Sequence, residues 1–316
     1  MPTLYVGTYT RKEGHVDGHA KGLHAYSFNE ITGALKLLNV MEKAGINPSY
    51  VCGTNTILYA VNESNELSLT RPGEETGFVS AYKMEKDGKL TQISRHETHG
   101  PYTCHVALSP NGDFLSVSNY NGGSLALYPV NADGSLSPAS DYHHFQGASM
   151  VIPDRQETSH IHSTAWTSNG LVAADLGTDR LVQYKLDVAA KNLIDEEFIS
   201  CPPGSGPRHF ALSMMLGVGY VINELSNTVS VYPLDVKTGK LSHVAIQHIS
   251  TLPLDYSGPS ALASDIHISG NNKFVYAATR FCNSITIYKI LPDTRLELVE
   301  ILHTRGFQQH RCLPCR

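Results

Sequence analysis

The feature that most restricts the fold is a pattern that the chain repeats six times. Each copy has a tyrosine within a short run of alternating apolar residues, then a turn, and then a leucine eight or nine residues after the tyrosine. In most copies the turn contains Gly, Asp or Asn, so each copy is typical of two antiparallel strands joined by a tight connection. The tyrosines recur every 46 to 56 residues and are Tyr26, Tyr82, Tyr128, Tyr184, Tyr232 and Tyr288.

Two more strands precede each tyrosine strand, with one exception at the start of the chain. The strand directly upstream reads LYVGTYT, LYAVNE, FLSVSNY, LVAADLG, YVINEL and FVYAATR in the six copies. Before all but the first of these comes another strand, which reads SYVCG, HVALS, HSTAW, HFALS and DIHIS. No segment shows a convincing helical period. Four strands repeated about every fifty residues predict an all-β fold, a β-propeller of four-stranded blades in which the tyrosines pack the blades.

The number of blades leaves two arrangements open. The chain encodes about six blades, and its first residues correspond to the second strand of a blade, so the innermost strand of that blade has to come from the far end of the chain. We expect one propeller domain over residues 1–316, with its C-terminal blade incomplete from about residue 305. This is either a six-bladed ring closed by the tail or a seven-bladed design without its last blade.

Charge and apolar patterning exclude several classes of partner. The formal net charge of -5 comes without clustered Lys and Arg, which argues against a nucleic-acid partner. No stretch approaches 18 consecutive apolar residues, so we expect no membrane span. The start of the chain lacks a basic segment followed by an apolar one, and we therefore expect no signal peptide and a cytoplasmic location.

Cysteine usage agrees with a reducing compartment. Cys52, Cys104, Cys201 and Cys282 are isolated in the sequence, which favours buried thiols over a disulfide framework. Cys312 and Cys315 form a single CxxC pair at the end, without the second pair of a zinc site or the context of a redox motif.

Polar residues on the inner strands indicate where chemistry would occur. Alignment of these strands by their distance to the next strand gives equivalent positions to Ser49, His105, His162, His209 and Asp265. The ends of the second strands add Glu63, Asn119, Asp175, Glu224 and Arg280, and Arg208 lies next to His209. In a propeller, such positions form a ring around the central channel. They either solvate that channel and cap strand ends, or form an anion-binding catalytic pocket of arginines with a proton-transferring histidine or glutamate.

Other site types fit the sequence less well. His160 and His162 would face the same side of a continuous strand, but a zinc site needs a third ligand from another blade, and nearby arginines would repel the cation. We expect no metal. The segment PPGSGPRH lacks the Lys-Ser/Thr of a P-loop and is interpreted as a tight loop that delivers Arg208 to the channel mouth. The sequence also lacks the G-x-S-x-G motif of serine hydrolases.

Several of these stretches together resemble one family. They are YVGTYT, NPSYV, CHVALSPNGDFLSVSNYNGGSLALYPV, RQETSHIHS, ADLGTDRL, GPRHFALS, YVINELSNTVSVY and SDIHISGNNKFVYAATRFCNSITIY. In this order they resemble the seven-bladed propeller lactonases, which include bacterial-type 6-phosphogluconolactonases and fungal carboxy-muconate lactonizing enzymes. The resemblance runs from residue 4 to about residue 290. The family normally continues into a last blade where this chain reads GFQQHRCLPCR and ends.

The resemblance implies a site in the channel mouth and an activity. The implied catalytic residues are His162, Arg208, Glu224 and Arg280. The implied reaction is hydrolysis of 6-phosphogluconolactone, in the pentose phosphate pathway, by attack of water on the ester carbonyl. Glu224 or His162 would be the base, and the two arginines would hold the phosphate and stabilise the oxyanion. His105, His160, His209, Asp265 and Asn119 are further candidates for substrate binding.

The resemblance implies no cofactor, and a partner that is a small phosphorylated or carboxylated lactone. Two alternatives stay open at this point. One is a carboxy-cis,cis-muconate lactonizing cycloisomerase on the same fold, and the other is a non-catalytic propeller scaffold. The oligomeric state is not predicted from the sequence.

Overall fold

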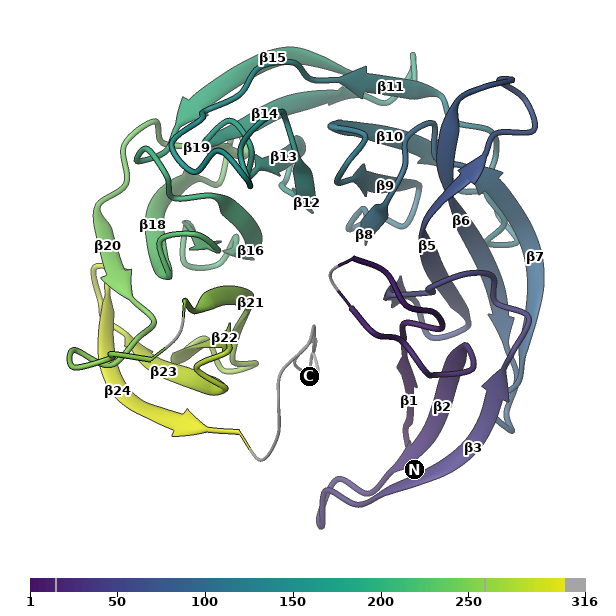
Figure 1. The fold of residues 1–316 in the computed structure, drawn as a ribbon, viewed down its shortest axis with the longest axis horizontal. Helices are drawn as coiled ribbons and strands as arrows, with labels where there is room; N and C mark the ends of the chain where they lie inside the picture. Colours follow the sequence, from purple (N-terminus) through teal and green to yellow (C-terminus); the bar gives the residue numbers. More distant parts are fainter. Residues whose placement is uncertain (15, 259, 305–316) are drawn as a thin grey trace. The chain divides into compact units, whose positions relative to one another are not determined.

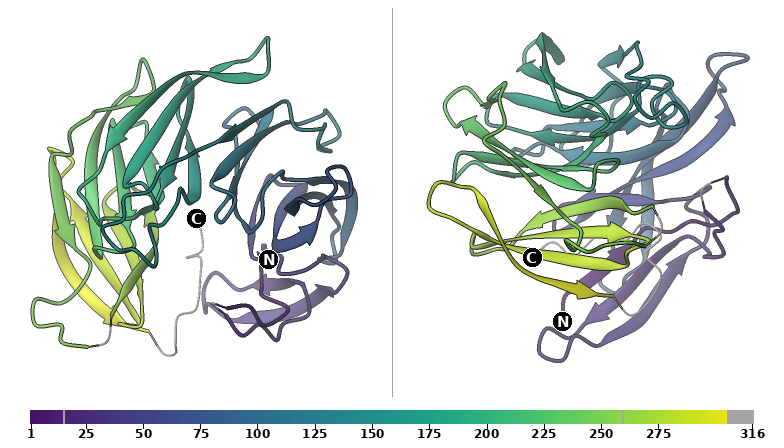
Figure 2. Two further views of the ribbon diagram at one scale, coloured as in Figure 1. Left: turned by 45° about the horizontal axis from the view of Figure 1, so that its top comes forward. Right: turned by 60° about the vertical axis from the view of Figure 1, so that its left-hand side comes forward.

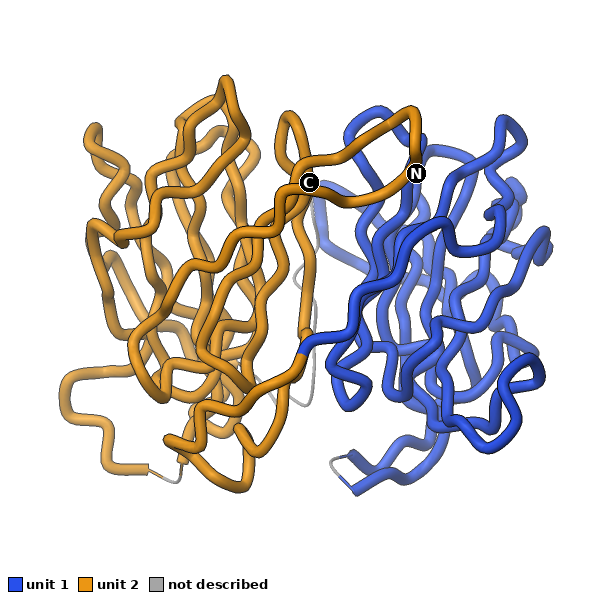
Figure 3. Tube along the Cα trace, turned by 90° about the horizontal axis from the view of Figure 1, so that it is seen from above, with its two compact units in different colours: residues 1–145 blue, residues 146–316 orange. Residues whose placement is uncertain are grey.

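All regular elements that the computed structural model describes are β-strands, numbered β1 to β24. The structure describes residues 1–14, 16–258 and 260–304. The chain divides into two compact units, Met1–Phe145 and Gln146–Arg316 (Figure 3). Among the described residues, each unit holds three antiparallel sheets, whose strands are labelled in Figure 1. In the described part of the chain, no helix is long and apolar enough to cross a membrane.

The first unit contains one sheet of three strands and two sheets of four. The three sheets are β1 (Thr3–Val6), β2 (Leu23–Phe28) and β3 (Leu35–Met41); β4 (Tyr50–Gly53), β5 (Ile57–Leu67), β6 (Glu75–Met84) and β7 (Leu90–Glu97); and β8 (Thr103–Leu108), β9 (Phe114–Asn119), β10 (Ser124–Pro129) and β11 (Asp141–His144). Leu4 of β1 pairs with Tyr26 as Leu58 of β5 pairs with Tyr82, so β1 is the second strand of its repeat, as predicted. The strand expected to complete this sheet falls on the tail after residue 304, outside the described residues.

The second unit contains the other three repeats, drawn from teal to yellow in Figure 2. Its sheets are β12 (Ile161–Trp166), β13 (Gly170–Asp175), β14 (Arg180–Asp187) and β15 (Asn192–Ser200); β16 (Pro207–Ser213), β17 (Val218–Asn223), β18 (Thr228–Asp235), β19 (Lys240–Leu241) and β20 (Gln247–Ser250); and β21 (Leu262–Ile268), β22 (Phe274–Arg280), β23 (Ser284–Ile290) and β24 (Leu296–His303). β19 and β20 both pair with β18 and together take the place of a fourth strand. The first strands β12, β16 and β21 are neighbours.

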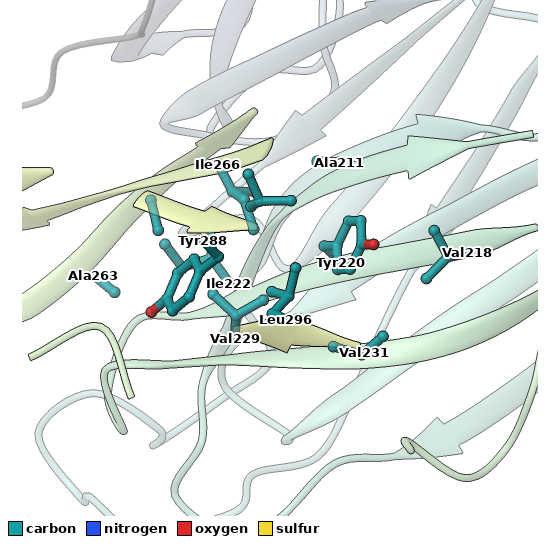
Figure 4. Packing of buried hydrophobic residues seen from close by; sticks show 12 residues of the cluster. Ala211, Val218, Tyr220, Ile222, Val229, Val231, Ala263, Ile266, Tyr288 and Leu296 are labelled. Carbon is teal, nitrogen blue, oxygen red and sulfur yellow. The ribbon is translucent and has the colours of Figure 1, made fainter. Parts of the chain in front are cut away.

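The repeated tyrosines pack neighbouring sheets against each other. Tyr288 lies in a buried cluster with Tyr220, Ile222 and Val229 of the preceding sheet (Figure 4). Its hydroxyl donates to the carbonyl of Ser250, which also belongs to that sheet, at 2.5 Å. The repeat therefore keeps tyrosine because the ring fills the space between sheets and the hydroxyl satisfies a carbonyl at their edge.

The same contact recurs in other copies. Tyr128 donates to the carbonyl of Glu97, at the end of the sheet before its own, at 2.7 Å. Tyr232 donates to the sulfur of Cys201, which directly follows the preceding sheet, at 3.6 Å. The sequence-based interpretation of the tyrosines as packing residues is confirmed for Tyr82, Tyr128, Tyr232 and Tyr288, which lie in buried clusters that span two sheets. Tyr184 is buried as well, and its packing role stays a prediction.

A β-bulge changes the register of the first strand at the same place in four sheets. A bulge sets two residues opposite one and breaks the alternation of side chains. The residues added to the strand in this way are Cys104, His162, Arg208 and Ser264. His162 and Arg208 are therefore equivalent positions in neighbouring sheets.

This register corrects the alignment made from the sequence. His105, His209 and Asp265 are equivalent to one another, but their counterpart in β12 is Ser163, not His162. In β4 the counterpart is Tyr50, one residue after Ser49. The alignment was wrong by one residue at His162 and Ser49 because it assumed connections of similar length. Paired residues of the first two strands are 13 positions apart at His105 and Ser118, but 11 apart at Ser163 and Ala174 and at Tyr50 and Val61.

The ends of the second strands also form two sets rather than one. Asn119 and Asp175 pair with the first residue of β8 and of β12. The equivalents of these two residues in the next sheets are Asn223 and Thr279, and Glu224 and Arg280 each come one residue later in the chain. Asn119 and Asp175 therefore hold their own sheets together. Glu224 and Arg280, one residue further on, form the cluster described below.

The tyrosine contacts give a prediction for stability. Replacing Tyr288 by Phe removes the hydrogen bond to Ser250, and we expect a loss of about 1 kcal/mol in the free energy of unfolding. Replacing it by Ala also leaves a cavity between two sheets and costs about 3–5 kcal/mol. Urea unfolding measures both. Tyr276→Phe on β22 is the control, because its half-buried hydroxyl donates no hydrogen bond among the described residues, and an equal loss there would contradict the assignment.

Candidate functional site

The candidate site in the second unit is centred on the carboxylate of Glu224, which directly follows β17. Its Oε2 accepts from Nε of Arg208 at 2.7 Å and lies 2.8 Å from Nη2 of Arg280. Its Oε1 accepts from Nη2 of Arg155 at 2.5 Å. The Glu224 side chain is only 2% exposed, so this negative charge is buried among three guanidinium groups.

Three separate parts of the unit supply the arginines. Arg208 is the bulged residue of β16, Arg280 ends β22, and Arg155 lies in the segment before β12. The side chains of Arg208 and Arg280 are 5% and 9% exposed, while that of Arg155 is 32% exposed. Three cations face one anion, and the remaining positive charge favours a ligand that carries a phosphate or carboxylate.

A tight loop positions Arg208, as the sequence indicated. The amides of Gly204 and Gly206 donate to the carboxylate of Asp179 at 2.6 and 2.8 Å. Gly206 has φ +59, and a Cβ there would lie 2.5 Å from Cγ of Leu225. Glycine is therefore required two residues before Arg208, both for the left-handed backbone and for the close approach to the chain next to Glu224.

Two histidines lie beside the arginines. Nδ1 of His209 lies 2.9 Å from Oδ1 of Asp265, and Nε2 of His209 lies 3.2 Å from Nη1 of Arg208. Since a guanidinium can only donate, Nε2 is the acceptor, and Nδ1 carries the proton that Asp265 accepts. The ring of His162 contacts the ring of His209 edge to face, with centroids 5.1 Å apart. Asp265 also lies 3.1 Å from Nε2 of His267, so it orients both neighbours.

These surroundings keep the histidines neutral and Glu224 ionised. Burial, with the charge of Arg208, lowers the pKa of His209 to about 4. Burial and the charges of Arg208 and Arg280, with His209 beside it, lower the pKa of His162 well below its usual value. Burial alone would raise the pKa of Glu224, but Arg280, Arg208 and Arg155 together outweigh it and hold that pKa far below the usual range.

For three other sequence candidates, the structure gives contacts with residues that are not members of this cluster. Nε2 of His160 lies 3.1 Å from a carboxylate oxygen of Glu157. Asn119 donates to the carbonyl of Thr98 and to Oγ of Ser124, contacts that tie its own loop and sheet together. His105 packs against the ring of Tyr50 in the first unit. Their suggested roles in substrate binding stay predictions, whereas His209 and Asp265 do adjoin the arginine cluster.

Strand alternation does not place the rings of His160 and His162 on the same side, as a zinc site would require. His160 precedes β12, and the bulge falls on His162, so the alternation that would place both imidazoles on one side does not apply here. Within residues 1–14, 16–258 and 260–304, no group of three or more His, Cys, Asp or Glu side chains is arranged to hold a metal ion.

The four isolated cysteines are free thiols, and Cys104, Cys201 and Cys282 are buried. Burial raises the pKa of Cys52 and Cys201 to about 12, so neither supplies a thiolate at neutral pH. Cys312 and Cys315 lie outside the described residues.

Sequence reasoning missed Arg155 as a member of the site. The residue belongs to RQETSHIHS, one of the stretches that carry the family resemblance, so a signal was present. No periodicity marks it, because it lies in a turn outside any strand. Its contact with Glu224 spans 69 residues and exists only in the folded chain.

Comparison with known proteins gives one family. The family model described as "Lactonase, 7-bladed beta-propeller" matches residues 3–308. The chain is 33% identical over 309 residues to 6-phosphogluconolactonase of Bacillus subtilis, covering 96% of this chain and 82% of the relative. It is 32% identical over 297 residues to 6-phosphogluconolactonase of Formosa agariphila, covering 91% and 78%.

Solved structures of proteins described as lactonases are also similar to this chain. The periplasmic gluconolactonase of Pseudomonas aeruginosa has a TM-score of 0.84 at 30% identity, over 97% of this chain and 84% of that one. A protein described as a putative 6-phosphogluconolactonase from Bacteroides fragilis has a TM-score of 0.83 at 30% identity, over 97% and 82%. The all-β propeller class and the family resemblance found in the sequence are both confirmed. The single domain and its incomplete last blade stay predictions.

The neutral state of His209 gives a prediction for pH. The unfolded chain takes up a proton on this histidine near pH 6.5, whereas the folded chain does so only near pH 4. The unfolded state therefore binds more protons between these values, and stability falls as the pH falls, by about 3 kcal/mol for this group at pH 4.

Urea unfolding at pH 7 and pH 4.5 measures this loss. We expect His209→Gln to flatten the dependence between the two pH values and the exposed His303→Gln to leave it unchanged. A dependence as steep in His209→Gln as in the unsubstituted chain would contradict the assignment.

Proposed function

Because the chain belongs to the seven-bladed β-propeller lactonase family, we propose that it hydrolyses 6-phosphogluconolactone to 6-phosphogluconate at the cluster around Glu224. The observation that carries the proposal is the cluster itself, in which three arginines on one buried carboxylate leave positive charge for an anionic substrate. A neutral histidine adjoins it. The names of the bacterial relatives support the same substrate.

His162 is the group that we assign as the base. A base has to be unprotonated at the working pH, and the lowered pKa of His162 keeps its imidazole neutral. Glu224 is also unprotonated, but guanidinium groups contact both of its oxygens, so its carboxylate is held in ion pairs and is less well placed to accept a proton from water. The choice between these two residues, open from the sequence, thus falls on His162, and Glu224 instead holds the guanidinium groups in place.

The proposed reaction has two steps. His162 removes a proton from water as the water oxygen bonds to the lactone carbonyl carbon, and Arg208 and Arg280 stabilise the negative charge that develops on the carbonyl oxygen. The bond from that carbon to the ring oxygen then breaks, and the imidazolium of His162 returns the proton to the leaving alkoxide. The product is the open-chain acid, and the histidine is neutral again.

A second candidate substrate is the same lactone without its phosphate. It is favoured by the similarity to the protein named a periplasmic gluconolactonase. Muconate cyclisation and a non-catalytic scaffold stay alternatives to hydrolysis. The cytoplasmic location, the pathway and the position of the cluster at a channel mouth stay predictions.

The first test measures hydrolysis of freshly generated 6-phosphogluconolactone above its spontaneous rate. We expect the purified chain to accelerate it and Arg208→Ala to lose at least about 100-fold in kcat/KM, since both oxyanion stabilisation and the contact with Glu224 are removed. Arg295→Ala is the matched control, because this arginine is exposed and pairs with Asp293 on a distant turn. A folded chain with no acceleration would contradict the proposal.

The second test concerns the base. Replacing His162 by Asn should lower kcat by about 10²–10⁴-fold with little change in KM. In the unsubstituted chain, kcat/KM should stay level as the pH falls from 7.5 through 6.5, because the lowered pKa of His162 moves the acidic limb to lower pH. A full-strength acidic limb in His162→Asn would assign the base to another group.

A further inference from the structure

The two oxygens of Glu224 divide the cluster into two sides. Oε2 faces Arg208 and Arg280, and Oε1 faces Arg155. His162 belongs to the first side, since its ring contacts His209, whose Nε2 lies 3.2 Å from Arg208. The groups assigned to the reacting carbonyl therefore gather on one side of this carboxylate, with Arg155 on the other.

Arg155 also differs from its partners in exposure. About a third of its side chain is exposed, while Arg208 and Arg280 are buried. A guanidinium has five N–H donors in a planar fork, so it can bind Glu224 on one edge and a second anion on another. About a third of the side chain is accessible, so an anion from solvent can reach this arginine.

The backbone that carries Arg155 is firmly held. Gln156, the next residue, is fully buried, and its side-chain oxygen accepts from the amide of Ile152 at 3.1 Å. Its side-chain nitrogen donates to the carbonyl of Leu176, next to the end of β13, at 2.9 Å. The amide of Arg155 donates to the carbonyl of Ile152 at 2.9 Å. This turn is fixed before any ligand arrives, which lowers the entropy cost of binding.

We propose that Arg155 binds the phosphate of the substrate and makes the site prefer a phosphorylated lactone over the unphosphorylated one. The proposal rests on the proposed lactonase activity. In the ring of 6-phosphogluconolactone, the carbonyl carbon and the carbon that bears the phosphorylated CH2 group are both bonded to the ring oxygen, and the carbonyl oxygen and the phosphate project from the ring in different directions. With the carbonyl on the side of His162, Arg208 and Arg280, we place the phosphate toward Arg155, with Glu224 between the two groups.

The test compares two lactones in Arg155→Ala and in the unsubstituted chain. A hydrogen bond between charged groups contributes enough that its loss should lower the ratio of kcat/KM for the phosphorylated over the unphosphorylated lactone by about 10- to 100-fold. Arg155→Lys keeps the charge without the fork and should give an intermediate ratio. Arg295→Ala, which replaces an exposed arginine elsewhere in the same unit, should leave the ratio unchanged.

Two results would overturn this role. If Arg155→Ala slows both lactones equally, Arg155 acts on the site through Glu224 and does not recognise the phosphate. If it changes neither, Arg155 is a surface residue without a role in the site.

Calorimetry separates this proposal from the lactonase activity, because binding of the open-chain products needs no turnover. We expect 6-phosphogluconate to bind more tightly than gluconate, with the difference reduced in Arg155→Ala. If the chain hydrolyses neither lactone but shows this difference, the activity fails and the phosphate site stands. Equal binding of the two acids would remove the phosphate site, whichever lactone is hydrolysed.

Discussion

The candidate site depends on one buried carboxylate that balances three guanidinium groups. Without Glu224, Arg208 and Arg280 would be buried cations close to each other, and the cost of removing them from water would have no compensation. With it, arginines from three parts of the second unit are held together at hydrogen-bond distance. The same contacts deprive Glu224 of basicity, so the residue that organises the arginines is a poor candidate for moving protons.

Local features deliver each group to this carboxylate. A β-bulge places His162 and Arg208 at equivalent positions of adjacent sheets, outside the regular alternation. Asp179 binds the amides of the loop before Arg208, and Gln156 fixes the turn that carries Arg155. The polar side chains with structural roles thus surround the ones proposed for chemistry, and the repeated tyrosines hold the sheets on which both depend.

Sequence reasoning predicted the fold correctly where residues recur at a regular spacing. Two-residue alternation and the recurrence of tyrosine defined the strands and the sheets, because each sheet buries the same faces against its neighbours. His162, Arg208, Glu224 and Arg280 were all named from the sequence, and the structure brings them together. The alignment failed at His162 and Ser49, since the connection between the first two strands is two residues shorter in their sheets than in the other three, and such a change leaves no mark on the strand pattern. It also overlooked Arg155, which no period identifies.

The sequence by itself determined the all-β class, the repeating unit, the family and most of the residues in the cluster, since all of these are properties of short segments and their spacing. Tertiary structure alone decided which oxygen of Glu224 meets which arginine, that Arg155 joins the cluster, and that the histidines are neutral. The reason is that pKa values and ion pairs depend on burial and on distances between residues far apart in the chain.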